Sequence, residues 1–247
     1  MKAERSLTIF VPALNEEGHL EASVNVVARA ARDARIDYEV IVVDDGSTDR
    51  TPAIADRLAA ADPAAKVIHH PACLGLGTAY RSAVEQASKA HFVFIPGDNS
   101  WPLESVSGLF GRLGEADVVI SYPLNAKEQR VGIRRFISTG YTSVLNLLHG
   151  QRLRYYNGLT IYPTAFLRAN PVQASGFGFA AELLLAAIYD GMTVLEVGLA
   201  IQERTGGASK AVSLRNIGSV LLSLWRGFWR LRLGMGRRAG GALSRDG

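Results

Sequence analysis

Two consecutive carboxylates, Asp44 and Asp45, directly follow an apolar run and precede Gly46. Acids in this place can accept hydrogen bonds from a nucleobase or ribose, or help to hold a divalent cation. They could instead cap the next helix, because Asp and Ser side chains satisfy the free amides at a helix N-terminus. Capping accounts for Thr48 or Asp49 but leaves two adjacent acids unexplained, so we interpret the pair as functional.

A single acid, Asp98, follows another apolar run and lies in the turn Pro96–Ser100. An isolated carboxylate at the end of a strand suits a hard cation that also takes phosphate oxygens. The alternative is an Asx-turn, in which Asp98 or Asn99 bonds its own backbone. The turn alone does not decide between the two.

The elements that position these acids alternate along the first half of the chain. Short β-branched runs predict strands at 7–12, 39–44, 66–69, 91–96 and 117–121, with helices at 17–34, 51–61, 77–89 and 103–113. This order predicts βαβ units and a parallel sheet covered on both faces. Since ligands of such sheets bind beyond the carboxyl ends of the strands, the turns at 12–16, 44–49 and 96–100 should converge there.

The second half is less regular, and we predict a helix at 133–148, a strand at 159–162, a helix at 180–189 and a strand at 193–200. No internal repeat or linker divides the chain. We therefore expect one domain over residues 1–212, followed by a basic amphipathic helix and flexible tail over residues 213–247.

The segment Gly75–Ala79 looks like a glycine-rich phosphate loop but lacks the full G-x-G-x-x-G pattern. A dinucleotide-binding fold would carry that pattern after its first strand, with an acid about 20 residues later. The first strand here ends in Pro12–Glu17 instead, so a nicotinamide-dependent oxidoreductase is excluded.

Several motifs run in order from about residue 7 to residue 212: Val11–Glu16, Val42–Thr51, Gly75–Ala79, Gly178–Glu182, Glu196–Val197 and Arg204–Lys210. In this series the chain resembles family 2 glycosyltransferases of GT-A fold, and within them the dolichol- or polyprenyl-phosphate sugar synthases. The resemblance implies an α/β nucleotide-diphospho-sugar transferase fold, with a mostly parallel central sheet flanked by helices and a C-terminal amphipathic helical appendage.

The resemblance also implies roles for individual residues. The donor, a nucleotide sugar, would be bound by Pro12, Ala13, Leu14, Glu16, Asp44, Asp45 and Gly77. Asp98, with Ser100 beside it, would hold Mg²⁺ or Mn²⁺ against the diphosphate, while Arg204 and Lys210 would stabilise charge on the departing nucleoside diphosphate. Members of this type transfer the sugar by direct displacement, with inversion at the anomeric carbon.

The sequence departs from the family pattern at several positions. Pro96 replaces the first acid of the Asp-x-Asp motif, and the segment Ile120–Pro123 lacks the usual arginine. An acid and an arginine are also missing from the segment Asn157–Tyr162. These departures leave open a protein that binds a sugar nucleotide without catalysis. A nucleotidyltransferase would need a glycine- and basic-rich first loop, which the chain lacks.

Two acceptors remain open. A polyprenyl phosphate is already an anion, so it needs cations to position it, and the basic stretch Lys127–Arg154 could supply them. A saccharide hydroxyl needs a carboxylate to take its proton, and the resemblance makes Glu182 the candidate. The alternative for Glu182 is a structural partner of an arginine or amide.

The charge and hydropathy of the C-terminal part favour contact with a lipid surface. Nine basic residues stand against Asp246 alone from Arg204 onward, so this part carries +8 and the first 203 residues −4, given a net charge of +4. Apolar residues recur at helical spacing from Leu214 to Leu231, with arginines beside them, which suits a membrane interface or packing against the core or a second subunit. Nucleic-acid binding is not expected, because no matching motif accompanies the charges.

The remaining features point to a cytoplasmic protein at the inner face of the cell membrane. The single cysteine, Cys73, excludes an internal disulfide. No secretory signal and no apolar run of roughly 20 residues is visible. The five histidines, among them His69 and His70, lack ligand-like spacing, and we interpret them as satisfied or exposed side chains. The sugar, the donor base and the oligomeric state are not readable from the sequence.

Overall fold

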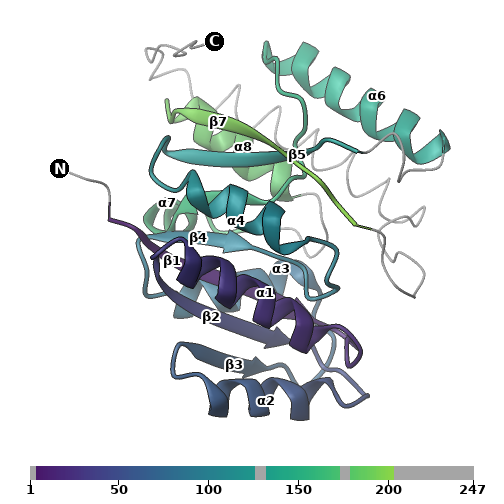
Figure 1. The fold of residues 1–247 in the computed structure, drawn as a ribbon. Coiled ribbons are helices and arrows are strands. Elements are labelled where there is room, and N and C mark those ends of the chain that lie inside the picture. The colour runs from purple at the N-terminus through teal and green to yellow at the C-terminus, as the bar shows by residue number, and fades with distance from the viewer. Residues whose placement is uncertain (1–3, 126–131, 173–178, 203–247) are drawn as a thin grey trace.

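A seven-stranded sheet forms the centre of the protein and carries helices on both faces (Figure 1). The structure is a computed structural model that describes residues 4–125, 132–172 and 179–202. Its strands are β1 Ser6–Ala13, β2 Asp37–Asp44, β3 Ala65–His69, β4 His91–Phe94, β5 Val118–Pro123, β6 Thr160–Pro163 and β7 Val194–Leu199. Its helices are α1 Leu20–Asp33, α2 Thr51–Ala61, α3 Leu76–Gln86, α4 Leu103–Gly111, α6 Gly132–His149, α7 Thr164–Ala169 and α8 Phe179–Tyr189.

The strand order is β3-β2-β1-β4-β6-β5-β7, and β6 alone among them runs antiparallel to its neighbours. All other strands therefore end at one edge of the sheet. The chain winds from β1 to β2 and β3 on one side and then places β4 on the other side of β1. Such a reversal opens a crevice at the carboxyl ends of the two strands, here β1 and β4.

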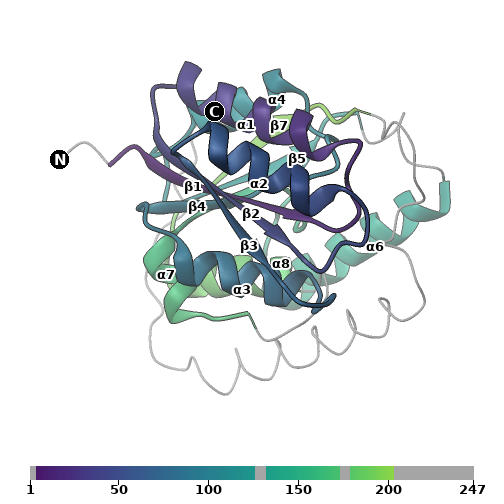
Figure 2. The same ribbon diagram turned by 90° about the horizontal axis from the view of Figure 1, so that it is seen from below.

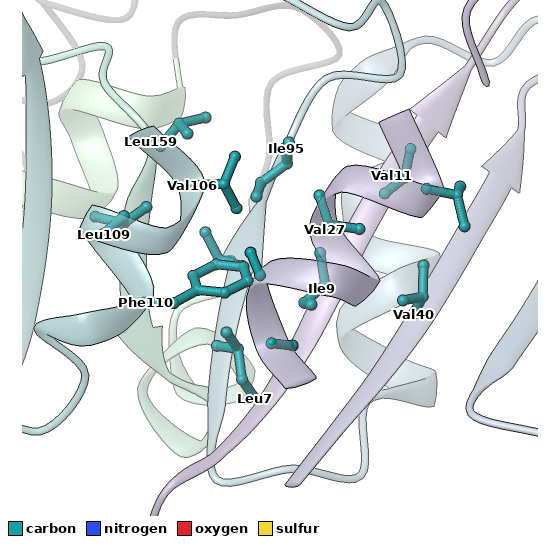
Figure 3. Close-up of a cluster of buried hydrophobic side chains, with 14 of the residues drawn as sticks. Leu7, Ile9, Val11, Val27, Val40, Ile95, Val106, Leu109, Phe110 and Leu159 are labelled. Carbon is teal, nitrogen blue, oxygen red and sulfur yellow. The ribbon is translucent and has the colours of Figure 1, made fainter. Parts of the chain in front are cut away.

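Two apolar cores hold the helices against the sheet. Alternate residues of β1, among them Leu7 and Ile9, face α1, α2 and α4, as Figure 3 shows for the centre of this core. Phe10 points to the opposite face, where α3, α7 and α8 pack (Figure 2). There the Tyr80 ring lies 5.8 Å from that of Phe10 and 4.8 Å from that of Phe179. The side chains of β1 thus alternate between the two cores, as the two-residue period of a strand requires.

The predicted elements are all present, and their ends differ for local reasons. Helix α1 begins at Leu20 instead of residue 17, because the amides of Glu16 and Glu17 donate to Thr51 Oγ1 and Asp49 Oδ2 of the next loop. Helix α7 was not predicted, since six residues are too few to show a helical period. The mostly parallel sheet of the predicted GT-A fold is confirmed.

The expected C-terminal helix and tail, residues 213–247, lie outside the described residues, and so does the expected boundary at residue 212. Within the described ranges, no helix is both long enough and apolar enough to cross a bilayer.

Candidate functional site

The loops after β1 and β2 are joined by a series of hydrogen bonds at the carboxyl edge of the sheet. Asn15 lies at its centre with a φ of 55°. Its amide donates to Ser47 Oγ at 2.9 Å, and its Oδ1 accepts from the Thr48 amide at 2.9 Å. The Asp45 amide donates to the Ala13 carbonyl at 2.9 Å. The two loops therefore behave as one surface, which contains Pro12, Ala13, Leu14 and Glu16 from the predicted donor site.

Asp44 and Asp45 are 3% and 5% exposed, and the carboxylates of both accept hydrogen bonds from nearby backbone amides. Asp44 Oδ1 accepts from the Ser47 amide at 3.0 Å. Asp45 accepts from the amides of Leu74 and Gly75 at 3.0 and 2.8 Å. Burial raises the pKa of the Asp45 carboxyl, but these bonds and one from a histidine outweigh it and lower the pKa below its usual value. Asp45 is therefore a carboxylate at neutral pH.

The amide at the start of α2 is satisfied by a different acid, and the N-cap residue Arg50 makes no side-chain capping bond. Asp49 Oδ1 accepts from the amide of Thr51, the first residue of α2, at 2.9 Å. The Thr48 hydroxyl instead donates to Asn15 Oδ1 at 3.4 Å. Asp44 and Asp45 take no part in capping α2, so their burial beside three loops requires another explanation.

The last residue of β3, His69, and the next residue, His70, contact these acids directly, which sequence reasoning missed. His69 Nδ1 lies 3.0 Å from Asp44 Oδ2, and its Nε2 lies 3.0 Å from Asp56 Oδ1. His70 Nδ1 lies 2.7 Å from Asp45 Oδ1. The hydrogen bonds that its ring makes to the Asp44 and Asp56 carboxylates raise the pKa of His69. The signal was in the sequence: an acid ends β2 and a second acid follows it, a histidine ends β3 and a second histidine follows it, and in the parallel register Asp44 pairs with His69.

Asp98 lies in the turn that follows β4, beside the switch point of the sheet between β1 and β4. Its Oδ1 accepts from the Ser100 amide at 3.1 Å and from the Ser100 hydroxyl, so the Asx-turn is present. The turn packs closely on β1: a Cβ on Gly97 would lie 2.7 Å from the Pro12 carbonyl oxygen. Asp98 is thereby fixed beside the predicted donor loop.

The oxygens of Asp98 and Ser100 have the chemistry of a magnesium or manganese site. No cluster of three or more His, Cys, Asp or Glu residues that could hold a metal occurs in the described part of the chain. Mg²⁺ does not need such a cluster, since it is commonly held by one or two carboxylates together with substrate phosphates and water. The residues present therefore fit a cation that is bound jointly with a diphosphate.

Glu182 lies in the first turn of α8. This helix runs back to β7, which is parallel to β5, so its N-terminus points to the carboxyl edge of the sheet. Gly77 lies buried in the first turn of α3, after Gly75, whose φ is 89°. The other two predicted catalytic residues, Arg204 and Lys210, lie outside the described residues.

An arginine that sequence reasoning did not single out lies at the carboxyl end of β5. The Arg154 guanidinium is 4.7 Å from the centre of the Tyr122 ring, and its Nη1 donates to the Tyr122 hydroxyl at 2.7 Å. Its amide donates to Glu196 Oε1 at 2.7 Å. Among the ion pairs of the described residues, none involves Arg154. An arginine from a later part of the chain thus lies at the end of β5, although the segment Ile120–Pro123 itself contains none.

The part of the chain that carries these loops matches a known protein family. Residues 8–173 match the family described as "Glycosyl transferase family 2". The chain belongs to this family. Its members transfer glycosyl groups, and the loops at the carboxyl edge, from β1 to β5, all fall inside the matched range.

Several curated relatives cover most of the chain. It is 30% identical over 226 residues to polyprenol monophosphomannose synthase of Mycolicibacterium smegmatis, covering 84% of this chain and 81% of the relative. It is 28% identical to undecaprenyl-phosphate mannosyltransferase of Micrococcus luteus, covering 94% and 100%. It is 27% identical to the low-salt glycan biosynthesis hexosyltransferase Agl6 of Haloferax volcanii. That match covers 83% of this chain but only 49% of the relative, so the chain spans about half of that protein's length.

A solved structure supports the family 2 fold. Glucosyl-3-phosphoglycerate synthase of Mycobacterium tuberculosis, solved with Mn²⁺, UDP-glucose and phosphoglyceric acid, superposes with a TM-score of 0.72. The two chains are 22% identical, and the match covers 92% of this chain and 81% of the synthase. At this identity the likeness establishes the GT-A architecture.

Proposed function

We propose that the protein transfers a sugar from a nucleotide-sugar donor to a polyprenyl phosphate by direct, metal-assisted displacement with inversion. The observation that carries the proposal is the meeting of the loops after β1, β2 and β4 beside Asp98, at the switch point of the sheet. The names of two relatives, a polyprenol monophosphomannose synthase and an undecaprenyl-phosphate mannosyltransferase, support the acceptor class.

The donor nucleoside would lie against the joined loops after β1 and β2. Residues 12–16 would contact it, while Asp44 and Asp45 would shape its binding surface together with Gly77 at the start of α3. A nucleoside diphosphate brings negative charge to the crevice. The Asp98 carboxylate and the Ser100 hydroxyl would hold Mg²⁺ or Mn²⁺ there, and the cation would neutralise charge on the leaving diphosphate.

Arg204 and Lys210 would add positive charge to the leaving group. The last described residues support this place for them, because the Gln202 amide donates to the Ser100 carbonyl at 3.1 Å and its side chain donates to the Asn99 carbonyl at 2.6 Å.

The acceptor phosphate would be bound by arginines, with Arg154 first among them. Its guanidinium is oriented by Tyr122 at the carboxyl end of β5 and has the fork of donors that matches phosphate oxygens. A phosphate is already a nucleophilic anion, so this reaction needs no general base. With a saccharide hydroxyl as acceptor, Glu182 would have to take the proton.

An exposed apolar face supports contact with the membrane that holds such an acceptor. Val144, Leu147 and Leu148 on α6 are 48%, 84% and 47% exposed and lie on one side of the helix by their spacing. Figure 1 shows α6 standing out from the sheet. Residues 129–181 contain six arginines and no acid. Apolar side chains beside such a charge excess suit an anionic lipid surface, and we place the protein at the inner face of the cell membrane.

A transfer assay tests the proposal. Purified protein is incubated with radiolabelled UDP-glucose or GDP-mannose, Mg²⁺ or Mn²⁺, and either a polyprenyl phosphate or the matching polyprenol. We expect label in the lipid phosphate alone. Label in the polyprenol or in added saccharide would contradict the phosphate acceptor and favour Glu182 as a base. Absence of transfer with donor binding intact would show a protein that only binds sugar nucleotides.

A further inference from the structure

We infer that His70 is a positioning residue of the donor site: through Asp45 it holds the loop 71–75 in place over Gly46. The inference rests on the proposed function for the identity of the donor. Its structural part, the clamp on the loop, rests on contacts between described residues alone. It concerns a residue that makes no contact with the reacting atoms.

Hydrogen-bond partners lie at both nitrogens of the His70 ring. Its Nδ1 lies 2.7 Å from Asp45 Oδ1, and a carboxylate can only accept, so Nδ1 carries the proton. Its Nε2 lies within hydrogen-bond distance, 3.0 Å, of the Ser82 hydroxyl of α3. The His70 and Asp45 side chains are 8% and 7% exposed. The pair is therefore held on two sides and shielded from water, where a charge-assisted bond is strong.

The Asp45 carboxylate, oriented by His70, binds the loop 71–75 by hydrogen bonds. Besides His70 it accepts from the amides of Leu74 and Gly75 and, at 3.4 Å, from the Cys73 thiol. A carboxylate offers about four acceptor positions, and these four donors fill them. The Asp45 oxygens thus hold the loop in place and are not available to bind a ligand.

The packing of Gly46 provides independent evidence that the loop is seated on the donor side. Gly46 has a φ of 76°, and a Cβ there would lie 2.5 Å from the Ala72 carbonyl carbon. The loop after β3 therefore runs directly over the turn after β2. The same turn is bonded to Asn15 of the β1 loop. Removing the His70 bond should loosen one wall of the nucleotide site while leaving Asp98 untouched.

The single cysteine of the chain, Cys73, lies in this loop and reports on it without any ligand. We would measure the rate of its alkylation and, separately, KM for the donor and kcat, in wild type, His70→Ala and His70→Asn. The Asn side chain restores a donor near the Nδ1 position. His91→Ala is the matched control, because His91 lies at the opposite end of the sheet, on the Ser6 carbonyl.

We expect His70→Ala to alkylate about tenfold faster and to raise KM for the donor about tenfold with kcat within about twofold, as for the loss of one charge-assisted bond. His70→Asn should restore most of both values, and His91→Ala should change neither. Equal alkylation rates in wild type and His70→Ala would overturn the clamp. A lower kcat at unchanged KM would overturn its role in donor binding. If the transferase proposal itself fails, wild type turns over no donor, and the alkylation rates still decide the clamp.

Discussion

At the scale of single residues, the site depends on one acid where the family pattern has two. Pro96 removes the first acid, and Asp98 remains with Ser100 as its neighbour. Gly97 lets the turn of Asp98 approach β1 at a distance that any side chain would prevent. The metal and donor assignments at this turn are proposals, and the close approach gives them a direct test.

Gly97→Ala should disturb the donor site more than the fold. The added Cβ would meet the Pro12 carbonyl oxygen at 2.7 Å, so either the turn or the β1 loop must move. Overpacking of this kind costs about 1–3 kcal/mol. We expect a lower melting temperature and at least a tenfold rise in donor KM. Gly111→Ala is the control: nothing lies within 4 Å of its added Cβ, so donor KM should stay at the wild-type value.

Arg154→Ala should weaken acceptor binding selectively. A charge-assisted pair of hydrogen bonds to phosphate is worth about 1.5–3 kcal/mol, so KM for the polyprenyl phosphate should rise by about 10- to 100-fold. Donor KM should remain unchanged. Arg29→Ala, which removes a largely exposed arginine of α1, provides the control for charge alone. An equal effect of both variants would contradict a specific phosphate contact.

The acids of the site could be predicted from sequence because they follow apolar runs, but their partners could not. His69 and His70 became interpretable only once the parallel register placed β3 beside β2. Arg154 reaches the end of β5 from a segment 32 residues further along the chain, and no local pattern indicates such a contact.

At the scale of elements, Glu39 connects three strands of the sheet. It lies in β2 and is 3% exposed, and it accepts from Thr8 of β1 and from Lys66 of β3, each at 2.7 Å. It also accepts from the Ser88 amide before β4. Burial raises its pKa, but the bonds from Lys66, Ser88 and Thr8 together lower it from 4.5 to about 2.

This shift predicts an acid-dependent loss of stability. A carboxyl whose pKa is lower in the folded state stabilises the fold above about pH 4.5 and loses that effect as the pH falls towards 2. The shift corresponds to at most about 3 kcal/mol. Glu39→Gln should therefore unfold more easily than wild type in urea at pH 7, with the difference shrinking towards pH 2. A difference independent of pH would show that the carboxylate charge is not the cause.

Strands and helices were predicted to within a few residues because the apolar periods are regular. The exceptions have physical causes in neighbouring segments. The start of α1 is set by acceptors in the loop before α2, and such acceptors are not visible in the sequence of α1 itself. The end of β4 at Phe94 leaves Ile95 to bond the Phe10 carbonyl outside the ladder.

At the scale of the whole molecule, the sequence favoured a parallel sheet but did not reveal its order. Strand β6 enters antiparallel between β4 and β5, which requires the chain to return from α6 to the middle of the sheet. The four residues of β6 show the same pattern for either strand direction. This insertion brings the end of β5 and the Arg154 segment to the edge that carries Asp98.

The exposed face of α6 should bind anionic lipid. We expect Leu147→Asp to reduce cosedimentation with vesicles of one-third phosphatidylglycerol severalfold, because it places a charge at the most exposed apolar position. Binding should also weaken with salt. Ala53→Asp, an exposed change on α2 at the other end of the sheet, should have no such effect (Figure 1). Equal vesicle binding of wild type and Leu147→Asp would assign the lipid contact to another surface.

The central claim is a metal-dependent nucleotide-sugar site built around Asp98, and thermal melting with UDP or GDP, each with and without Mn²⁺ or Mg²⁺, tests it most directly. A ligand at 100 times its Kd stabilises by about 2.7 kcal/mol, which for this size corresponds to about 5–11 °C. We predict such a shift for one base, dependent on the cation and lost in Asp98→Asn. An equal shift in Asp98→Asn, or none with any nucleotide and cation, would contradict the claim.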